Sequence, residues 1–177
     1  SSDLDNERNI TMTLRRRLAA AFTTFLALPL LTLPLVTQPA AAHDYKLGSL
    51  EIGNPWTRAT PPSAQSGGGF LTSTNKGTTP DRLTAVRSAA SGTVEIHEMK
   101  MDGNVMRMRE LAKGLEIAPG ATVELKPGGY HIMFMNLKAP FAKDGKIPAT
   151  LVFEKAGSID VELDVAALGA AAPMQKH

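Results

Sequence analysis

The 177-residue sequence contains no cysteine. Neither a disulfide nor a thiolate ligand or nucleophile can therefore form within it, and a blue-copper electron-transfer site, which needs a cysteine thiolate, is excluded. Aromatic residues are also scarce, at 5 %, and the net charge is only +2, from 19 basic and 17 acidic residues. This near-neutral balance gives no reason to expect nucleic acid as a partner.

The first 42 residues have the pattern of an export signal. Arg15, Arg16 and Arg17 precede an apolar run over 18–36, which ends in three small residues at 40–42. This order of basic, apolar and small residues is typical of a cleaved secretory signal, and we expect a periplasmic protein. The length of the run leaves an uncleaved membrane anchor as an alternative, although two prolines within the run argue against it.

We therefore predict three parts of the chain: upstream residues and a signal peptide over 1–42, one β-domain over 43–168 and a disordered Ala-rich tail over 169–177. The β-domain is expected to act as a monomer and not to insert into a membrane. Its short alternating or β-branched runs, separated by Gly, Pro, Asn and Asp, indicate an all-β fold, an antiparallel Greek-key β-sandwich. The nine predicted strands cover 47–52, 70–74, 83–86, 93–99, 105–109, 122–125, 131–135, 150–153 and 159–165.

Several short segments are predicted to be turns rather than strands. They include Asn54-Pro55, the triple glycine at 67–69, and Lys126-Pro127-Gly128-Gly129, which suits a type II turn. The triple glycine does not suggest a phosphate loop, because no helix follows it. Trp56 and Tyr130 are read as large core side chains.

The methionines are clustered: six of the eight lie between Met99 and Met135. Asp102-Gly103 is a strong signal for a two-residue β-hairpin turn. If that turn forms, His97 lies opposite Met108, Met99 opposite Met106 and Glu98 opposite Arg107, so that an imidazole and a thioether can share a metal. A turn at Gly103-Asn104 would instead place His97 opposite Glu110 and remove this pairing.

A second pair of candidate ligands lies on one later strand. His131 and Met133 are two residues apart, so they project from the same face of the sheet while Ile132 and Phe134 point the other way. Thioether sulfur is a soft ligand that selects Cu(I), and imidazole also accepts copper. Two His with two Met thus predict a site for one Cu(I) at His97, Met108, His131 and Met133, and neutral thioethers suit a carrier that must release its ion.

These motifs resemble those of the periplasmic PCuAC-type copper chaperones. The shared pattern is a His, ten residues, a Met, about twenty-one residues, and then His-x-Met. Here ten residues separate His97 from Met108, and 22 residues separate Met108 from His131. The phrases Pro55-Trp56-Thr57-Arg58, Gly128-Gly129-Tyr130-His131 and Phe153-Glu154-Lys155-Ala156-Gly157 are also similar, and the likeness runs from about residue 47 to 165.

The resemblance implies a cupredoxin-like fold with those four ligands. It also implies delivery of Cu(I) to the CuA centre of cytochrome c oxidase, with Sco-type proteins as companions. Other readings stay open. Met99, Met101, Met106 and Met135 are read first as core residues, with Met99 as a spare ligand and Met101 and Met135 as residues that could rim the site.

Other functions are weighed against the copper carrier. His43, Met174 or His177 could hold Cu(II) weakly at a second site. An oxygen-using copper enzyme at His43 would need a second histidine nearby, and no serine has a recognisable partner, so we do not expect an enzyme. The alternative without metal is an exported adhesion or assembly domain, which would show a large apolar patch or an open sheet edge.

Overall fold

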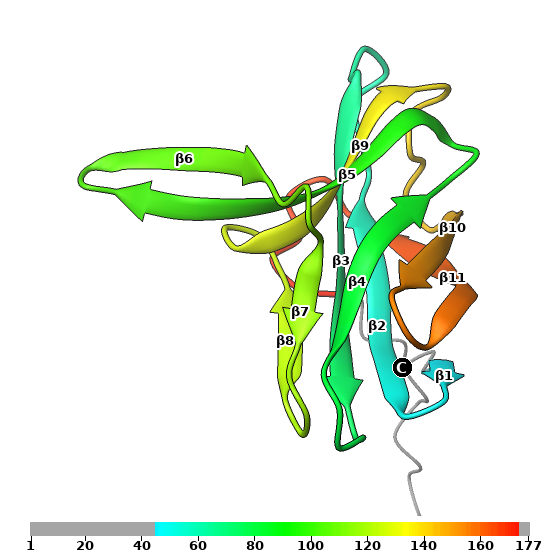
Figure 1. Ribbon diagram of the computed structural model, residues 1–177. Helices are drawn as coiled ribbons and strands as arrows, with labels where there is room; N and C mark the ends of the chain where they lie inside the picture. Colours follow the sequence, from blue (N-terminus) through cyan, green and yellow to red (C-terminus); the bar gives the residue numbers. More distant parts are fainter. Residues whose placement is uncertain (1–44, 174–177) are drawn as a thin grey trace, which may run out of the picture. The chain divides into compact units, whose positions relative to one another are not determined.

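The computed structural model describes residues 45–173, which form one mixed sheet of eleven strands (Figure 1). The predicted signal peptide, His43, Met174 and His177 lie outside the described residues. Within residues 45–173 no helix is long and apolar enough to cross a membrane. The strands are β1 (Tyr45–Leu47), β2 (Leu50–Arg58), β3 (Ser66–Asn75), β4 (Asp81–Arg87), β5 (Ser91–Asp102), β6 (Val105–Glu110), β7 (Leu115–Ile117), β8 (Thr122–Leu125), β9 (Tyr130–Leu137), β10 (Lys146–Phe153) and β11 (Gly157–Ala166).

The all-β class is confirmed, but the sheet is mixed rather than purely antiparallel. Its order is β6-β5-β9-β8-β3-β2-β11-β10-β4-β7, with β1 paired to β2. Strand β11 runs parallel to β2, and β8 meets β9 in parallel at the single pair Leu125 and Tyr130. Parallel neighbours need a long crossover, and the chain between β2 and β11 supplies one, which no local sequence pattern reveals.

One hydrophobic core joins strands from both ends of this order. Ile96 of β5 and Ile132 of β9 belong to the same buried cluster as Leu83 of β4 and Ile117 of β7. The sheet therefore curls until its two halves face each other across shared apolar side chains. On β9 the alternation is strict in the middle, because Ile132 and Phe134 are fully buried while Met133 between them is only partly buried. The core thus fixes which face of β9 carries His131 and Met133.

The nine predicted strands all overlap observed ones, with differences at glycines. Gly48 turns the chain with a φ of +59° and divides the first predicted run into β1 and β2. The triple glycine is not a turn but part of β3. A Cβ on Gly69 would come within 2.8 Å of Phe134 Cε2 and 3.0 Å of Leu163 Cδ2. Glycine is required there because the strand packs closely against its neighbours. The sequence analysis took the run of glycines as a sign of a turn, and that prediction is wrong.

Two other details depart from the sequence analysis. Asn54-Pro55 lies inside β2, where Asn54 has a φ of +49° and the register with β3 shifts, so this segment is a bulge and not a turn. The three-residue strand β7 was missed.

The predicted end of the β-domain at residue 168 stays a prediction. Just beyond it, Ala170 accepts a 2.7 Å hydrogen bond from Arg58 Nε and packs against the buried Trp56 and Phe70.

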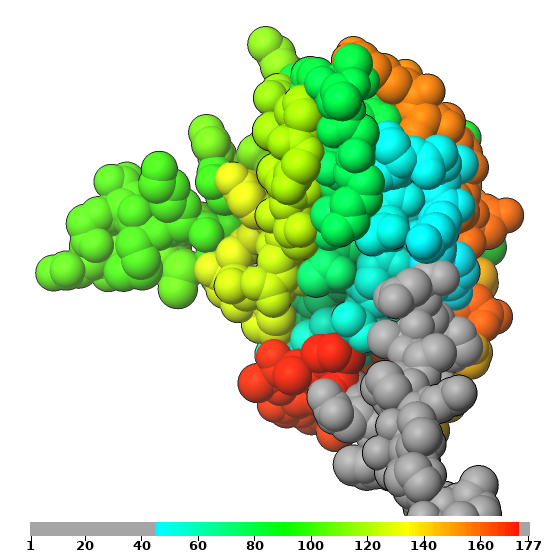
Figure 2. Space-filling model, turned by 90° about the horizontal axis from the view of Figure 1, so that it is seen from below, coloured from blue at the N-terminus to red at the C-terminus, as the bar shows by residue number. Residues whose placement is uncertain are grey.

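The β5-β6 hairpin extends away from the rest of the domain (Figure 1), and Figure 2 shows it as a protruding lobe. Strand β6 is at one end of the sheet order and pairs with β5 alone among the described strands. All six of its residues are exposed. The core therefore holds the base of the hairpin, and the outer part has no apolar support beyond its own two strands.

Candidate metal centre

The hairpin turn differs from the predicted one by a single residue. Asp102 pairs with Val105, so Gly103 and Asn104 are the two central turn residues. Gly103 has a φ of +61° and Asn104 does not have a positive φ, as expected for a type II′ turn, which places Gly first. The prediction of an Asp102-Gly103 turn is therefore wrong. His97 lies opposite Glu110, and Met108 lies opposite Met99.

The corrected register still keeps the candidate ligands on one face. Moving the turn by one residue changes the partner of each β5 residue by two positions, and side chains two apart on a strand share a face. Met108 is thus the diagonal neighbour of His97 instead of its direct partner. Diagonal Cβ atoms lie about 7–8 Å apart or slightly less, within reach of a long thioether side chain.

The opposite face of the hairpin carries the ion pairs. Glu98 pairs with Arg109 at 2.7 Å, and not with Arg107 as the predicted register required. Arg107 instead pairs with Asp102, also at 2.7 Å. The two faces of this ribbon therefore differ in chemistry, with the two ion pairs on one face and the methionines, His97 and Glu110 on the other.

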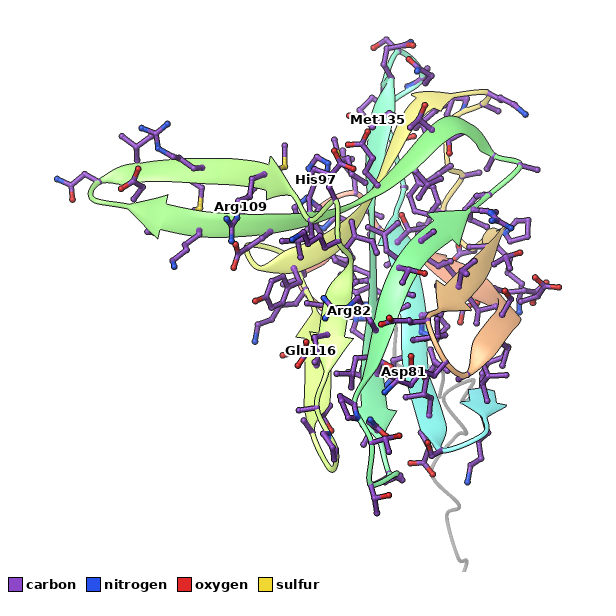
Figure 3. All side chains as sticks on the ribbon, viewed as in Figure 1. Asp81, Arg82, His97, Arg109, Glu116 and Met135 are labelled. Atoms are coloured by element: carbon purple, nitrogen blue, oxygen red, sulfur yellow. The ribbon has the colours of Figure 1, made fainter. Side chains whose placement is uncertain are left out.

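The pairing of β5 with β9 brings the two histidines together. His97 lies directly opposite His131, and Glu95 lies opposite Met133. The ring centroids of the histidines are 5.7 Å apart in an edge-to-face arrangement. Figure 3 shows His97 at the base of the projecting hairpin. Thus β6, β5 and β9, three neighbouring strands, present the four candidate ligands on one side of the sheet.

The turn before β9 fixes the orientation of the His131 ring. Gly128 has a φ of +82° and Gly129 N–H donates to the Lys126 carbonyl at 3.0 Å, which agrees with the predicted type II turn. The Gly129 carbonyl accepts hydrogen bonds from the Met99 N–H at 3.1 Å and from His131 Nδ1 at 3.0 Å. Since a carbonyl can only accept, Nδ1 carries the proton and Nε2 keeps a free lone pair for a metal.

The His97 ring is oriented by a carboxylate that the sequence analysis did not single out. His97 Nε2 lies 2.7 Å from Glu95 Oε2, and the His97 side chain is only 12 % exposed. In the neutral ring, Nε2 then donates to Glu95 and Nδ1 holds the lone pair. That Nδ1 is buried and has no hydrogen-bond partner among the described residues. A buried lone pair without a partner is unfavourable unless a ligand uses it. The i, i+2 spacing of Glu95 and His97 on a strand was the available signal.

The donor set favours a soft ion. Among residues 45–173 no three His, Asp or Glu side chains gather as a metal-binding group. A metal on this face would therefore need the thioethers to complete its coordination. Met108 is 48 % exposed, Met133 is partly buried, and His131 is 7 % exposed. Solvent exposure therefore increases across the site from the His131 nitrogen to the Met108 sulfur. Imidazole with thioether is a combination suited to Cu(I).

The remaining methionines were first predicted to be core residues, and the structure differs from that prediction. Met101 and Met106 are more than half exposed, so the core reading is wrong for both. Met99 is partly buried beside Met108, and Met135 lies farther along β9, opposite Thr93. Trp56 is buried, as predicted for a core side chain.

Comparison with solved structures shows that the domain has the fold of PCuAC domains. The apo PCuAC domain from PmoF1 is 27 % identical, with a TM-score of 0.61 over 71 % of this chain and 99 % of that domain. The copper-bound PCuAC domain from PmoF2 is also 27 % identical, with a TM-score of 0.61 over 71 % and 98 %. The resemblance inferred from the sequence motifs is confirmed.

The family model described as "Putative lipoprotein LpqE-like" matches residues 50–165. This protein therefore belongs to the LpqE-like family. A relative from Leifsonia xyli subsp. xyli, "Putative lipoprotein Lxx21020", is 31 % identical over 156 residues, which are 87 % of this chain and 93 % of that protein. Both descriptions agree with an envelope or exported protein.

Proposed function

We propose that this protein binds one Cu(I) through His97, Met108, His131 and Met133 and passes it to an acceptor protein. The observation that carries the proposal is the cross-strand pair of His97 and His131, in which each ring has one nitrogen hydrogen-bonded and the other available. The likeness to a copper-bound PCuAC domain supports the same reading. The proposed role is carriage and not catalysis.

The exposed position of the sulfur ligand Met108 favours transfer of the ion to an acceptor. Met108 is about half exposed on β6, which among the described strands has no outer neighbour, so an acceptor can approach the ion from that side. Thioethers are neutral and leave the bound ion without charge compensation from the ligands themselves. A competing site with more thiolate or imidazole ligands can then take the ion over by ligand exchange.

The proposed acceptor and compartment rest on the family resemblance. We propose the CuA subunit of cytochrome c oxidase as recipient, with a Sco-type protein as companion, in the periplasm after export through the N-terminal signal. Within these 177 residues an acyl chain linked through cysteine has no attachment point, because cysteine is absent. We expect the mature domain to work as a monomer in solution and not in the membrane.

A titration of the protein with Cu(I), in competition with a chromophoric chelator, tests the proposal. We expect one tightly bound ion, and its loss when Met108 and Met133 are both changed to Leu, since leucine keeps the apolar volume and removes the sulfur. Unchanged binding by this double variant would reject the named ligands. A loaded protein that transfers copper to a purified CuA domain would support the recipient, and no transfer would reject it.

Glu95 supplies a further expected result. In Glu95→Gln the amide oxygen can still accept from His97 Nε2, but the carboxylate charge that makes the Nδ1 lone pair a more basic ligand is lost. Loss of such an outer partner typically weakens metal binding about 10–100-fold, and we expect a decrease in that range in the same chelator competition. Glu98→Gln is the matched control, because Glu98 points to the other face and pairs with Arg109. Equal affinities of both variants would contradict the role of Glu95.

An adhesion or assembly domain without metal is the alternative function. Two features favour it: within residues 45–173 the outer edge of β6 is unpaired, and apolar residues of the hairpin such as Val105 and Met106 are exposed. It predicts no copper stoichiometry, so the titration separates the two functions.

A further inference from the structure

Four methionines form two consecutive cross-strand pairs on the projecting hairpin. Met99 lies opposite Met108, and Met101 lies opposite Met106. The pairs extend outward from His97 toward the Gly103-Asn104 turn, and Figure 3 shows sulfur atoms, in yellow, along this hairpin. Only Met108 belongs to the proposed inner site.

The hydrogen-bond pattern brings the two side chains of each pair close together at their base. The Leu111 N–H donates to the Ile96 carbonyl at 2.7 Å, which makes this a hydrogen-bonded pair. Hydrogen-bonded and non-hydrogen-bonded pairs alternate along an antiparallel ladder. Counting from there toward the turn, both methionine pairs are of the non-hydrogen-bonded type, whose Cα atoms are only about 4.5 Å apart and whose side chains are closer.

The fold does not account for the outer pair. Met101 is 53 % and Met106 54 % exposed, and neither belongs to the hydrophobic core or to the residues packed against it. Long unbranched side chains of this exposure add little to stability, and the ion pairs that brace the hairpin lie on its other face. Two adjacent exposed thioethers are a soft, neutral donor pair.

We propose that Met101 and Met106 form a second binding site for a soft monovalent ion, Cu(I), at the end of the hairpin. With two thioether ligands open to solvent, this outer site binds more weakly than the inner one and exchanges faster. Its position in the transfer route rests on the proposed function: the ion moves between the outer site, the pair of Met99 and Met108, and the histidines. It stays Cu(I) throughout, so no electron is transferred.

Ag(I), a soft monovalent ion that does not change oxidation state here, is the probe for the outer site. With methionine methyl groups labelled with 13C, NMR should show the Met101 and Met106 methyl signals shifting upon addition of a second equivalent. The same shifts should appear in His131→Asn, in which the inner site is disabled. The outer site can therefore be confirmed even if the inner site is not. If the methyl shifts vanish in His131→Asn, the outer site does not bind independently of the inner site and this part of the proposal is wrong.

Leucine substitutions separate metal binding from apolar contact. In the double variant Met101→Leu and Met106→Leu the surface stays apolar but has no sulfur, and we expect loss of the second Ag(I) equivalent and slower Cu(I) transfer, with unchanged affinity for the first ion. Met135→Leu, on β9 away from the hairpin, is the control for removing a methionine. If the double variant keeps the second equivalent, Met101 and Met106 are not ligands and the proposed outer site is wrong. If it loses the second equivalent but transfers copper at the original rate, the outer site is not part of the transfer route.

Discussion

Changing His131 to Asn should weaken Cu(I) binding by more than about 100-fold, above the range typical for the loss of an outer partner. The asparagine side chain can still donate to the Gly129 carbonyl, which accepts from His131 Nδ1 at 3.0 Å, so the turn keeps its contact. What is lost is the Nε2 lone pair beside His97. Competition with a Cu(I) chelator gives the affinity, and X-ray absorption of the loaded variant gives the number of nitrogen neighbours, which should fall by one.

Two controls accompany this substitution. His131 is buried, so the melting temperature of the metal-free variant must be measured to exclude general unfolding as the cause. Met135→Leu, two strand positions beyond Met133, should bind copper as the original protein does. An affinity within tenfold of the original in a folded His131→Asn protein would show that this imidazole is not a ligand.

The sequence predicted the face of the site more reliably than its contacts. The alternation of His131 and Met133 with Ile132 and Phe134 is enforced by burial, because a shift by one residue would expose two fully buried side chains. The position of the hairpin turn had no such constraint. Asp102-Gly103 and Gly103-Asn104 both suit two-residue turns, and both registers keep Met108 on the face of His97. The predicted direct pairing of His97 with Met108 was therefore wrong while the shared face was right.

Long-range pairings could not be read from the sequence. The pairing of β5 with β9, which sets His97 against His131, joins strands that are separated by three others in the chain. It depends on how the whole sheet closes over its core, and no local pattern encodes that. Gly69 illustrates the same limit. A side chain at this position would collide with Phe134, which lies on a neighbouring strand that is far away in the sequence. Glu95 was missed for another reason: its i, i+2 spacing from His97 places both on one face, but whether the two side chains meet depends on the rotamer of His97.

Phe134→Ala should cause the largest loss of stability among core substitutions near the site. Phe134 is fully buried, and its ring meets Phe141 edge to face at 5.5 Å between centroids. Removing a buried phenylalanine ring costs about 3–5 kcal/mol of unfolding free energy, because apolar contact is lost and a cavity remains. Domains have about 5–15 kcal/mol in total, so we expect a large fall in the guanidinium midpoint of the metal-free protein. Phe134→Leu should lose less.

A double-mutant cycle with Gly69 makes this prediction specific to the packing seen here. Gly69→Ala alone should be destabilising by about 1–3 kcal/mol, since its Cβ would lie 2.8 Å from Phe134 Cε2. With the ring already removed in Phe134→Ala, the shortest of these contacts is gone and the cost of the added methyl group should shrink, although Leu163 Cδ2 remains at 3.0 Å. The two free-energy changes must therefore be non-additive, with a coupling of the size found for residues in contact, about 0.5–3 kcal/mol. Strict additivity would mean that β3 and β9 do not pack at this point as described, and the strand alignment that places Met133 beside the histidines would lose its support.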